Sequence, residues 1–152
     1  MNIYELAMKM EKEGSEFYSK ASKECNDTWL KGIFEYLAIE ESKHYKIFRE
    51  MKENANTLNE VNLNSSQDII SAFEKKKKER IIECLRDLQS DVYIAAAKDE
   101  KASIDLYEGL LNESENEEEK KALSLIIEEE KSHLNFFKEV IELMGKIQEQ
   151  RK

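Results

Sequence analysis

The chain has 152 residues, the size of one domain that can bury a substantial core. It contains no proline and only four glycines, and it is rich in Glu, Lys, Leu, Ile and Ala, which favours long helices over sheet. The net charge of −9 argues against nucleic acid as a main partner, because a phosphate-binding face needs clustered Lys and Arg.

Two features of the sequence bear on location. Cys25 and Cys84 form no C-x-x-C pair, and two lone thiols indicate a reducing compartment and not a disulfide framework. Met1 leads directly into an amphipathic pattern, and no apolar stretch approaches the ~20 residues that a membrane span requires. We therefore expect a cytoplasmic protein with no membrane partner.

The first pair of helices is expected over residues 2–54. Its first helix should run to Cys25, with Asn2 as the N-cap and Glu5 three residues later completing a capping box. The segment Asn26-Asp27 predicts a turn and the cap of the second helix. Because this connection is short, the two helices should form an antiparallel hairpin.

The periodic pattern weakens over 55–89, where asparagine and serine are frequent, and this segment is expected to be a long crossover. A second helical hairpin is expected over 90–149. Its first helix should run over 90–112, and Ser114 with Glu117 suggests a capping box for its second helix.

The lengths of these segments predict the topology. A helix of ~26 residues spans ~39 Å, and a connection of roughly thirty residues can reach that far. If the crossover runs the length of the bundle, the order of the helices is up-down-down-up. We therefore predict one all-α domain over 1–152, a four-helix bundle with an internal two-fold repeat.

The two halves of the chain repeat chemically active residues at an offset of 89 positions. The repeated pairs are Glu11 and Glu100, Tyr18 and Tyr107, Glu41 and Glu130, and His44 and His133. One Glu-x-x-His motif would mean little in a chain so rich in glutamate. Here both histidines of the chain belong to such a motif on a helical stripe, and the other carboxylates repeat at the same offset.

This repeat predicts a dinuclear metal site inside the bundle. Residues three apart on a helix point the same way, so a Glu-x-x-His pair can offer an oxygen and a nitrogen to one metal. Four buried carboxylates would repel one another, whereas two divalent cations cancel their charge. The predicted ligands are Glu11, Glu41, His44, Glu100, Glu130 and His133.

Several neighbouring residues have more than one interpretation. We expect Tyr18 and Tyr107 to act beside the metals as hydrogen-bond donors or redox groups, or else to be core aromatics with satisfied hydroxyl groups. Glu40, Glu128 and Glu129 are expected to face outward or to contact the ligands, but not to be ligands themselves. Both cysteines are expected to be inert, and the run of four lysines at 75–78 to be solvated.

At these residues the chain resembles the ferritin-like superfamily, and within it the rubrerythrin-like di-iron carboxylate proteins. The matching elements are Glu11 with Tyr18, residues 37–44, Glu100 with Tyr107, and residues 128–133. The resemblance implies a ferritin-like bundle that holds two iron ions. Glu41 and Glu130 would be the carboxylates of the two motifs, His44 and His133 the terminal nitrogen ligands, and Glu11 and Glu100 terminal or bridging ligands.

The resemblance also implies redox chemistry, because members of the superfamily oxidise ferrous iron, reduce peroxide or oxygen, or store iron. The chain has Ser103 where rubrerythrins have a further glutamate, and two cysteines cannot build their four-cysteine rubredoxin module. A peroxidase would therefore need electrons from a separate protein, and a homodimer is expected in place of a storage shell. Manganese or zinc could replace iron. The alternatives are a non-catalytic metal-buffering protein and a metal-free helical interaction module.

Overall fold

The computed structural model describes residues 2–53 and 90–150. These ranges contain four helices, α1 (Ile3–Glu24), α2 (Thr28–Lys52), α5 (Ser90–Glu113) and α6 (Glu117–Gln150). The predicted crossover over 55–89, with its four lysines and Cys84, lies outside the described residues. None of the helices in the described ranges is long and apolar enough to cross a membrane.

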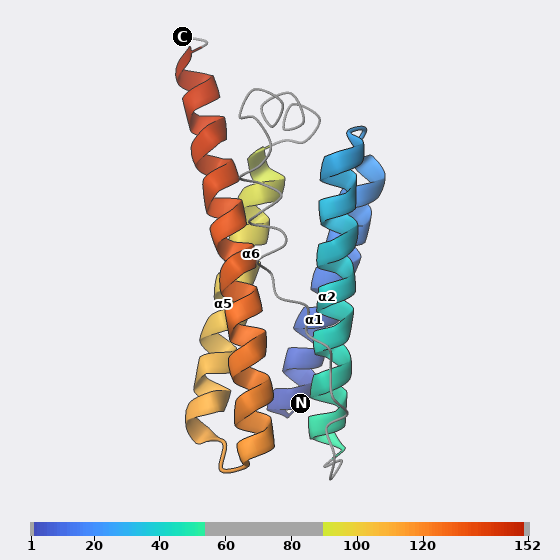
Figure 1. The fold of residues 1–152 in the computed structure, drawn as a ribbon, viewed down its shortest axis with the longest axis vertical. Coiled ribbons are helices and arrows are strands. Elements are labelled where there is room, and N and C mark those ends of the chain that lie inside the picture. Colours follow the sequence, from blue (N-terminus) through green and yellow to red (C-terminus); the bar gives the residue numbers. More distant parts are fainter. Residues whose placement is uncertain (1, 54–89, 151–152) are drawn as a thin grey trace.

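The helices follow the predicted order. Figure 1 shows α1 rising from the N-terminus, α2 returning beside it, α5 running in the same direction as α2, and α6 rising to the C-terminus. The end of α2 and the start of α5 therefore lie at opposite ends of the bundle. This confirms an all-α, up-down-down-up four-helix bundle of the ferritin-like fold.

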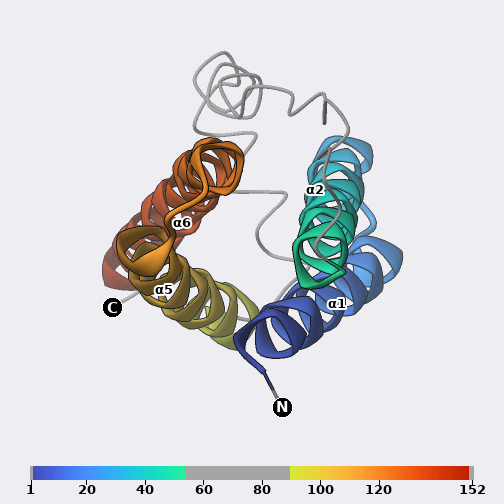
Figure 2. The same ribbon diagram turned by 90° about the horizontal axis from the view of Figure 1, so that it is seen from below.

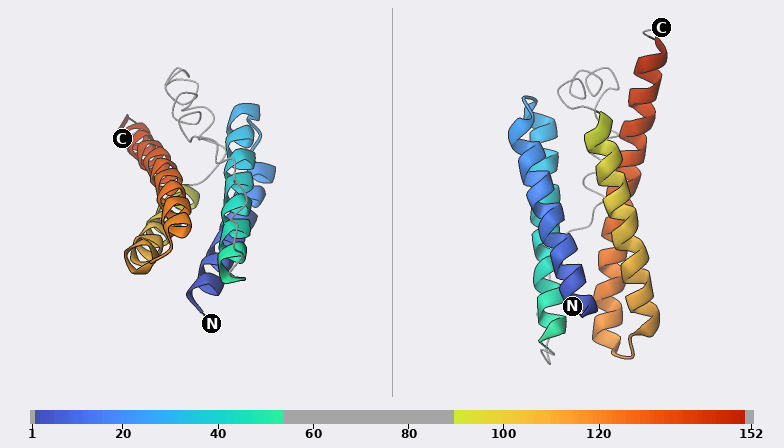
Figure 3. Two further views of the ribbon diagram at one scale, coloured as in Figure 1. Left: turned by 60° about the horizontal axis from the view of Figure 1, so that its bottom comes forward. Right: turned by 180° about the vertical axis from the view of Figure 1, so that it is seen from behind.

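The two hairpins face each other across the centre of the bundle. Helix α1 packs along α2, and α5 packs along α6. Seen end-on in Figure 2, α1 also neighbours α5, and α2 lies opposite α6. The views in Figure 3 show the same separation into two hairpins. Residues from all four helices can therefore meet only on the inner faces of the hairpins.

The first two helix starts agree with the sequence. The backbone N–H of Glu5 donates to Asn2 Oδ1 at 2.8 Å, and the N–H of Asn2 donates to Glu5 Oε2 at 3.3 Å, which completes the capping box. Asp27 Oδ1 accepts from the N–H of Leu30 at 2.9 Å and caps α2. Both caps satisfy N–H groups that have no partner within their own helix.

The predicted capping box at the start of α6 is wrong in register. Because the helix begins at Glu117, the preceding Asn116 is the cap, and its Oδ1 accepts from the N–H groups of Glu118 at 2.9 Å and Glu119 at 3.1 Å. Ser114 lies too far back for this role. Its hydroxyl group donates instead to the Glu119 side chain at 3.3 Å.

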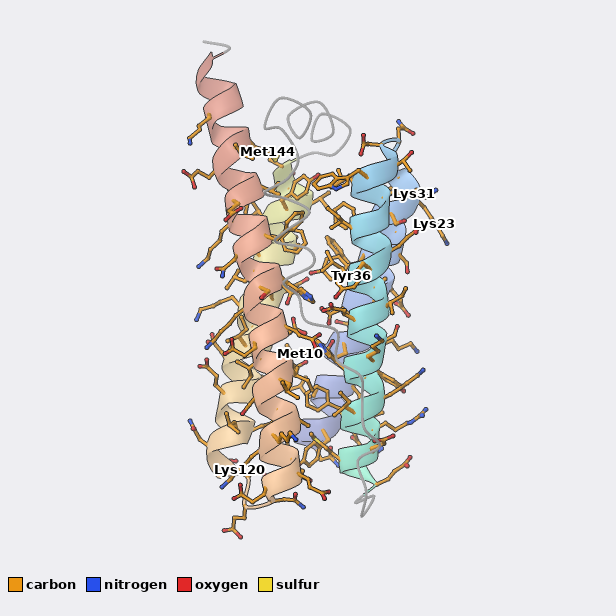
Figure 4. All side chains as sticks on the ribbon, viewed as in Figure 1. Met10, Lys23, Lys31, Tyr36, Lys120 and Met144 are labelled. Atoms are coloured by element: carbon orange, nitrogen blue, oxygen red, sulfur yellow. The ribbon has the colours of Figure 1, made fainter. Side chains whose placement is uncertain are left out.

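The core consists of two apolar clusters with a polar layer between them. The cluster nearer the α1–α2 turn includes Tyr18, Phe34, Leu37, Tyr93 and Phe137. The cluster at the other end includes Ala7, Phe48, Tyr107, Leu123 and Ile126. In Figure 4 oxygen and nitrogen atoms lie between the hairpins at mid-height, whereas the labelled Lys23 and Lys31 point outward. The apolar clusters close both ends of this polar layer.

Candidate metal centre

The structure brings the six predicted ligand residues together at the middle of the bundle. They are Glu11 from α1, Glu41 and His44 from α2, Glu100 from α5, and Glu130 and His133 from α6. None of the six is more than 4% exposed. On α2 and α6 the Glu-x-x-His spacing places a carboxylate and an imidazole on one helix face, one turn apart.

The six residues form two overlapping groups, and within each group one ligand-type atom per residue lies within 4.8 Å of all the others. The first group is Glu11, Glu41, His44 and Glu130, and the second is Glu41, Glu100, Glu130 and His133. Glu41 and Glu130 belong to both groups, and this sharing suits carboxylates that bridge two cations. Glu11 and Glu100 belong to one group each, which suits a terminal role.

Both histidines turn the Nδ1 atom toward the centre. His44 Nδ1 lies 2.8 Å from Glu130 Oε1 and 3.4 Å from Glu11 Oε2. His133 Nδ1 lies 3.4 Å from Glu100 Oε1 and 3.5 Å from Glu41 Oε1. The Nδ1 atom is therefore the nitrogen that each imidazole can offer to a metal.

The other ring nitrogen of each histidine meets a second buried glutamate. His44 Nε2 lies 3.1 Å from Glu129 Oε2, and His133 Nε2 lies 2.6 Å from Glu40 Oε2. A carboxylate in this position holds the Nε2–H tautomer, so that the Nδ1 lone pair faces the metal. The contact between His44 and Glu129 belongs to a further group in the described residues, Glu40, His44 and Glu129, whose ligand-type atoms lie within 4.8 Å of one another.

These two glutamates are the site residues for which the sequence left two interpretations. Glu40 and Glu129 are 2% and 5% exposed and contact the imidazoles, whereas Glu128 is exposed. Each contacts the histidine of the opposite hairpin. The signal that could have found them is the repeat itself, because Glu40 and Glu129 are also 89 positions apart.

The two repeated tyrosines also reach across the bundle. The hydroxyl group of Tyr18 donates to Glu100 Oε1 at 2.5 Å, and that of Tyr107 donates to Glu11 Oε1 at 2.5 Å. Both tyrosines belong to the apolar clusters, and Tyr107 also packs against Phe48 with ring centroids 4.7 Å apart. They are core aromatics whose hydroxyl groups are satisfied by the predicted ligands.

The surroundings of the two shared carboxyl groups favour the neutral form. Burial raises the pKa of Glu41 well above its usual 4.5, and the charge of Glu11 raises it further. Burial likewise raises the pKa of Glu130, with an added contribution from the charge of Glu100. Taking a carboxylate out of water beside like charges disfavours the ionised form.

The remaining four groups pair as ions. Burial would raise the pKa of Glu11, but the charge of His44 and the hydrogen bonds with Glu41, His44 and Tyr107 together outweigh burial and lower the pKa. Burial also opposes ionisation of Glu100, whose pKa the hydrogen bond from Glu130 and the charge of His133 lower to about 2. Burial alone would lower the pKa of both imidazoles. The surrounding glutamates together raise both pKa values well above 6.5, and the main contributors are Glu11 for His44 and Glu100 for His133. Without metal, protons on the imidazoles offset the charges of Glu11 and Glu100.

The donor set fits two divalent cations. Glu11 Oε2, Glu41 Oε1, Glu100 Oε2, Glu130 Oε2 and His133 Nδ1 are buried and have no hydrogen-bond partner among the residues that the structure describes. A buried polar atom that lacks a hydrogen bond costs about 1–3 kcal/mol, and five of them in one place point to ligands. Oxygen and imidazole donors suit iron or manganese, and they also bind zinc.

A four-helix bundle with two buried Glu-x-x-His motifs and two further inward glutamates defines the class of dinuclear carboxylate proteins. The rubrerythrin family model matches residues 2–141, which contain α1, α2, α5, most of α6 and all six predicted ligands. The chain belongs to the rubrerythrin family, as the resemblance of its repeated motifs indicates. Comparisons with curated proteins and with solved structures gave no match.

Proposed function

We propose that the protein is a di-iron protein that carries out redox chemistry with peroxide or oxygen, as a peroxidase or a ferroxidase. The observation that carries this proposal is the pair of overlapping ligand groups that share Glu41 and Glu130. Glu41 and Glu130 would hold both cations, and such a pair would be able to act together on one small oxidant. Membership of the rubrerythrin family supports iron as the metal.

When bound, two ferrous ions supply one electron each, which together with two protons reduce hydrogen peroxide to two molecules of water. The residues of the chain prepare the place for this reaction. Glu129 and Glu40 orient His44 and His133 through their Nε2 atoms. The two apolar clusters close the ends of the polar layer and exclude bulk water from these two directions.

Electrons for repeated turnover come, in this proposal, from a separate protein. The sequence has two cysteines, and a rubredoxin-type iron site needs four. Tyr18 and Tyr107 are buried, with their hydroxyl groups bonded to terminal carboxylates. We assign them the role of holding Glu100 and Glu11 in place as the charge of the centre changes.

A peroxide titration tests the proposal. Protein loaded with ferrous iron under anaerobic conditions is mixed with increasing hydrogen peroxide, and ferric absorption is followed in the near ultraviolet. We expect absorption to rise rapidly and to saturate at about one peroxide per chain, because two ferrous ions supply two electrons. A metal-buffering protein would bind iron without rapid oxidation, and a metal-free helical module would bind none.

Two variants and a matched control strengthen this test. Glu41→Ala and His133→Ala remove predicted ligands, and both should abolish the rapid ferric signal. Glu128→Ala changes an exposed residue close to the same motif on α6 and should keep it. Equal signals in all three variants would contradict the assignment of the site.

A further inference from the structure

A partly open cavity of about 90 Å³ lies between α1 and α5 and leads to the metal centre. Two exposed carboxylates line it, Glu13 from α1 and Asp99 from α5. The buried carboxylates of Glu41 and Glu100 line it as well. Met10, which is labelled in Figure 4, also lines this cavity. Carboxylates therefore line the cavity from solvent to the centre.

Two small residues keep this cavity open. Gly14 follows Glu11 by three positions and Ser103 follows Glu100 by three, so both lie on the helix faces that carry the predicted ligands. A Cβ atom at position 14 would lie 3.4 Å from Glu41 Oε2. A larger side chain at either position would fill the space in front of the shared carboxylate.

Two residues that line the cavity, Glu41 and Glu100, each have a buried oxygen atom without a hydrogen-bond partner among the described residues. Glu41 Oε1 and Glu100 Oε2 have none within the described ranges 2–53 and 90–150, although both residues are at least 96% buried. The bundle is closed toward both ends by apolar clusters, which offer no ligand to an ion in transit. The acidic cavity is thus a polar approach to the centre from the side.

We propose that this cavity is the port through which divalent cations reach the centre, with Glu13 and Asp99 as transient outer ligands. The proposal rests on the metal-binding function proposed above. A cation that enters a buried site must exchange water for protein oxygens, and carboxylates along the path supply them stepwise. A cleft lined by one sign of charge also raises the rate of ion capture by 10-fold or more.

The rate of cobalt uptake tests the port. Metal-free protein is mixed anaerobically with Co²⁺ at low ionic strength, and the visible absorption of bound cobalt is followed by stopped flow. The double variant Glu13→Gln with Asp99→Asn should take up cobalt at least five-fold more slowly, with a weaker dependence on salt. Its final content should stay at two cobalt ions per chain, because the centre itself is unchanged.

A control of equal charge change uses exposed positions on the same helices. Glu16→Gln with Asp91→Asn lies outside the cavity lining and should change the rate less than two-fold. Ser103→Leu, which fills the cavity, should slow uptake more than the charge variant does. If Ser103→Leu fails to fold, the comparison of the Glu13 and Asp99 double variant with the Glu16 and Asp91 control still tests the port.

The outcomes separate the port from the function. An unchanged uptake rate in the Glu13 and Asp99 double variant, with two cobalt ions bound, would overturn the port and leave the centre intact. Equal slowing in the control pair would also overturn it, because the effect would then reflect net charge alone. Failure of the unaltered protein to bind cobalt would contradict the proposed function itself and remove the basis of the port.

Discussion

The hydroxyl group of Tyr107 in α5 donates a hydrogen bond of 2.5 Å to Glu11 in α1, so the second hairpin holds a predicted ligand of the first. The reciprocal bond runs from Tyr18 in α1 to Glu100 in α5, also at 2.5 Å. The sequence repeat is therefore interleaved in space. Neither hairpin can complete its half of the centre without the other.

Replacing Tyr107 with phenylalanine removes one of these bonds and leaves the ring. Because Glu11 is buried and ionised, losing the hydrogen bond should lower the free energy of unfolding of the metal-free protein by about 1.5–3 kcal/mol. Urea denaturation measures the change. Tyr45→Phe, at a half-buried position of α2, is the control and should change stability by less than about 0.5 kcal/mol. Equal losses in both variants would contradict the account.

Shared and terminal carboxylates should respond differently to neutralisation. Burial and the neighbouring carboxylates favour the neutral form of Glu41 in the metal-free protein, so Glu41→Gln should change the free energy of unfolding at pH 7 by less than about 1 kcal/mol. Glu11 is ionised and pairs with the protonated His44, so Glu11→Gln leaves a buried charge and should cost about 3–5 kcal/mol. Urea denaturation without metal compares the two variants. A larger loss in Glu41→Gln would contradict the assigned proton positions.

The stability of the metal-free protein should depend on pH. Glu41, Glu130 and both histidines have raised pKa values, so each stabilises the metal-free protein at low pH and loses this contribution as pH rises. The loss begins above pH 4.5 for the two glutamates and above pH 6.5 for the two histidines. The lowered pKa values of Glu11 and Glu100 act oppositely, and their contribution is lost as pH falls below 4.5.

Metal-free protein should thus be most stable near about pH 5 and weaken toward pH 8. Two bound cations displace the protons of two carboxyl groups and two imidazoles, so metal should bind more tightly as pH rises. The difference in Tm between metal-loaded and metal-free protein should therefore grow from pH 5 to pH 8, and thermal denaturation measures it. A difference that stays constant over this range would rule out proton displacement.

The glutamates that contact the Nε2 atoms of the histidines should affect the affinity for metal but not the number of metal ions bound per chain. Glu129→Gln weakens the hydrogen bond that orients His44, which should lower metal affinity 10- to 100-fold. At saturating metal the variant should still bind two ions per chain. Glu128→Gln changes the exposed neighbour and serves as the control. Calorimetric titration with Co²⁺ compares them, and equal affinities would show that Glu129 has no such role.

Most of the fold could be predicted because its signals are local. Asn2 and Asp27 are caps whose side chains satisfy nearby backbone groups, and such contacts depend on a few residues only. The predicted start of α6 is wrong because both Ser114 and Asn116 are good caps. Sequence alone does not fix which of two candidates two positions apart precedes the first helical residue.

The sequence repeat predicts which residues form the site, but not how they contact one another. The offset of 89 residues identified all six residues that converge, but it did not show which contacts cross between hairpins. Tyr18 lies two turns from Glu11 on the same helix, yet its hydroxyl group bonds Glu100 on another helix. The contacts of Glu40 and Glu129 also depend on how α2 faces α6, which no local pattern encodes.

Anomalous diffraction from crystals of the iron-loaded protein tests the central claim most directly. We predict two iron peaks inside the bundle, each bounded by one terminal glutamate and one histidine, with the carboxyl groups of Glu41 and Glu130 between them. A single peak, or iron held only at the surface with the six side chains unliganded, would contradict the dinuclear centre.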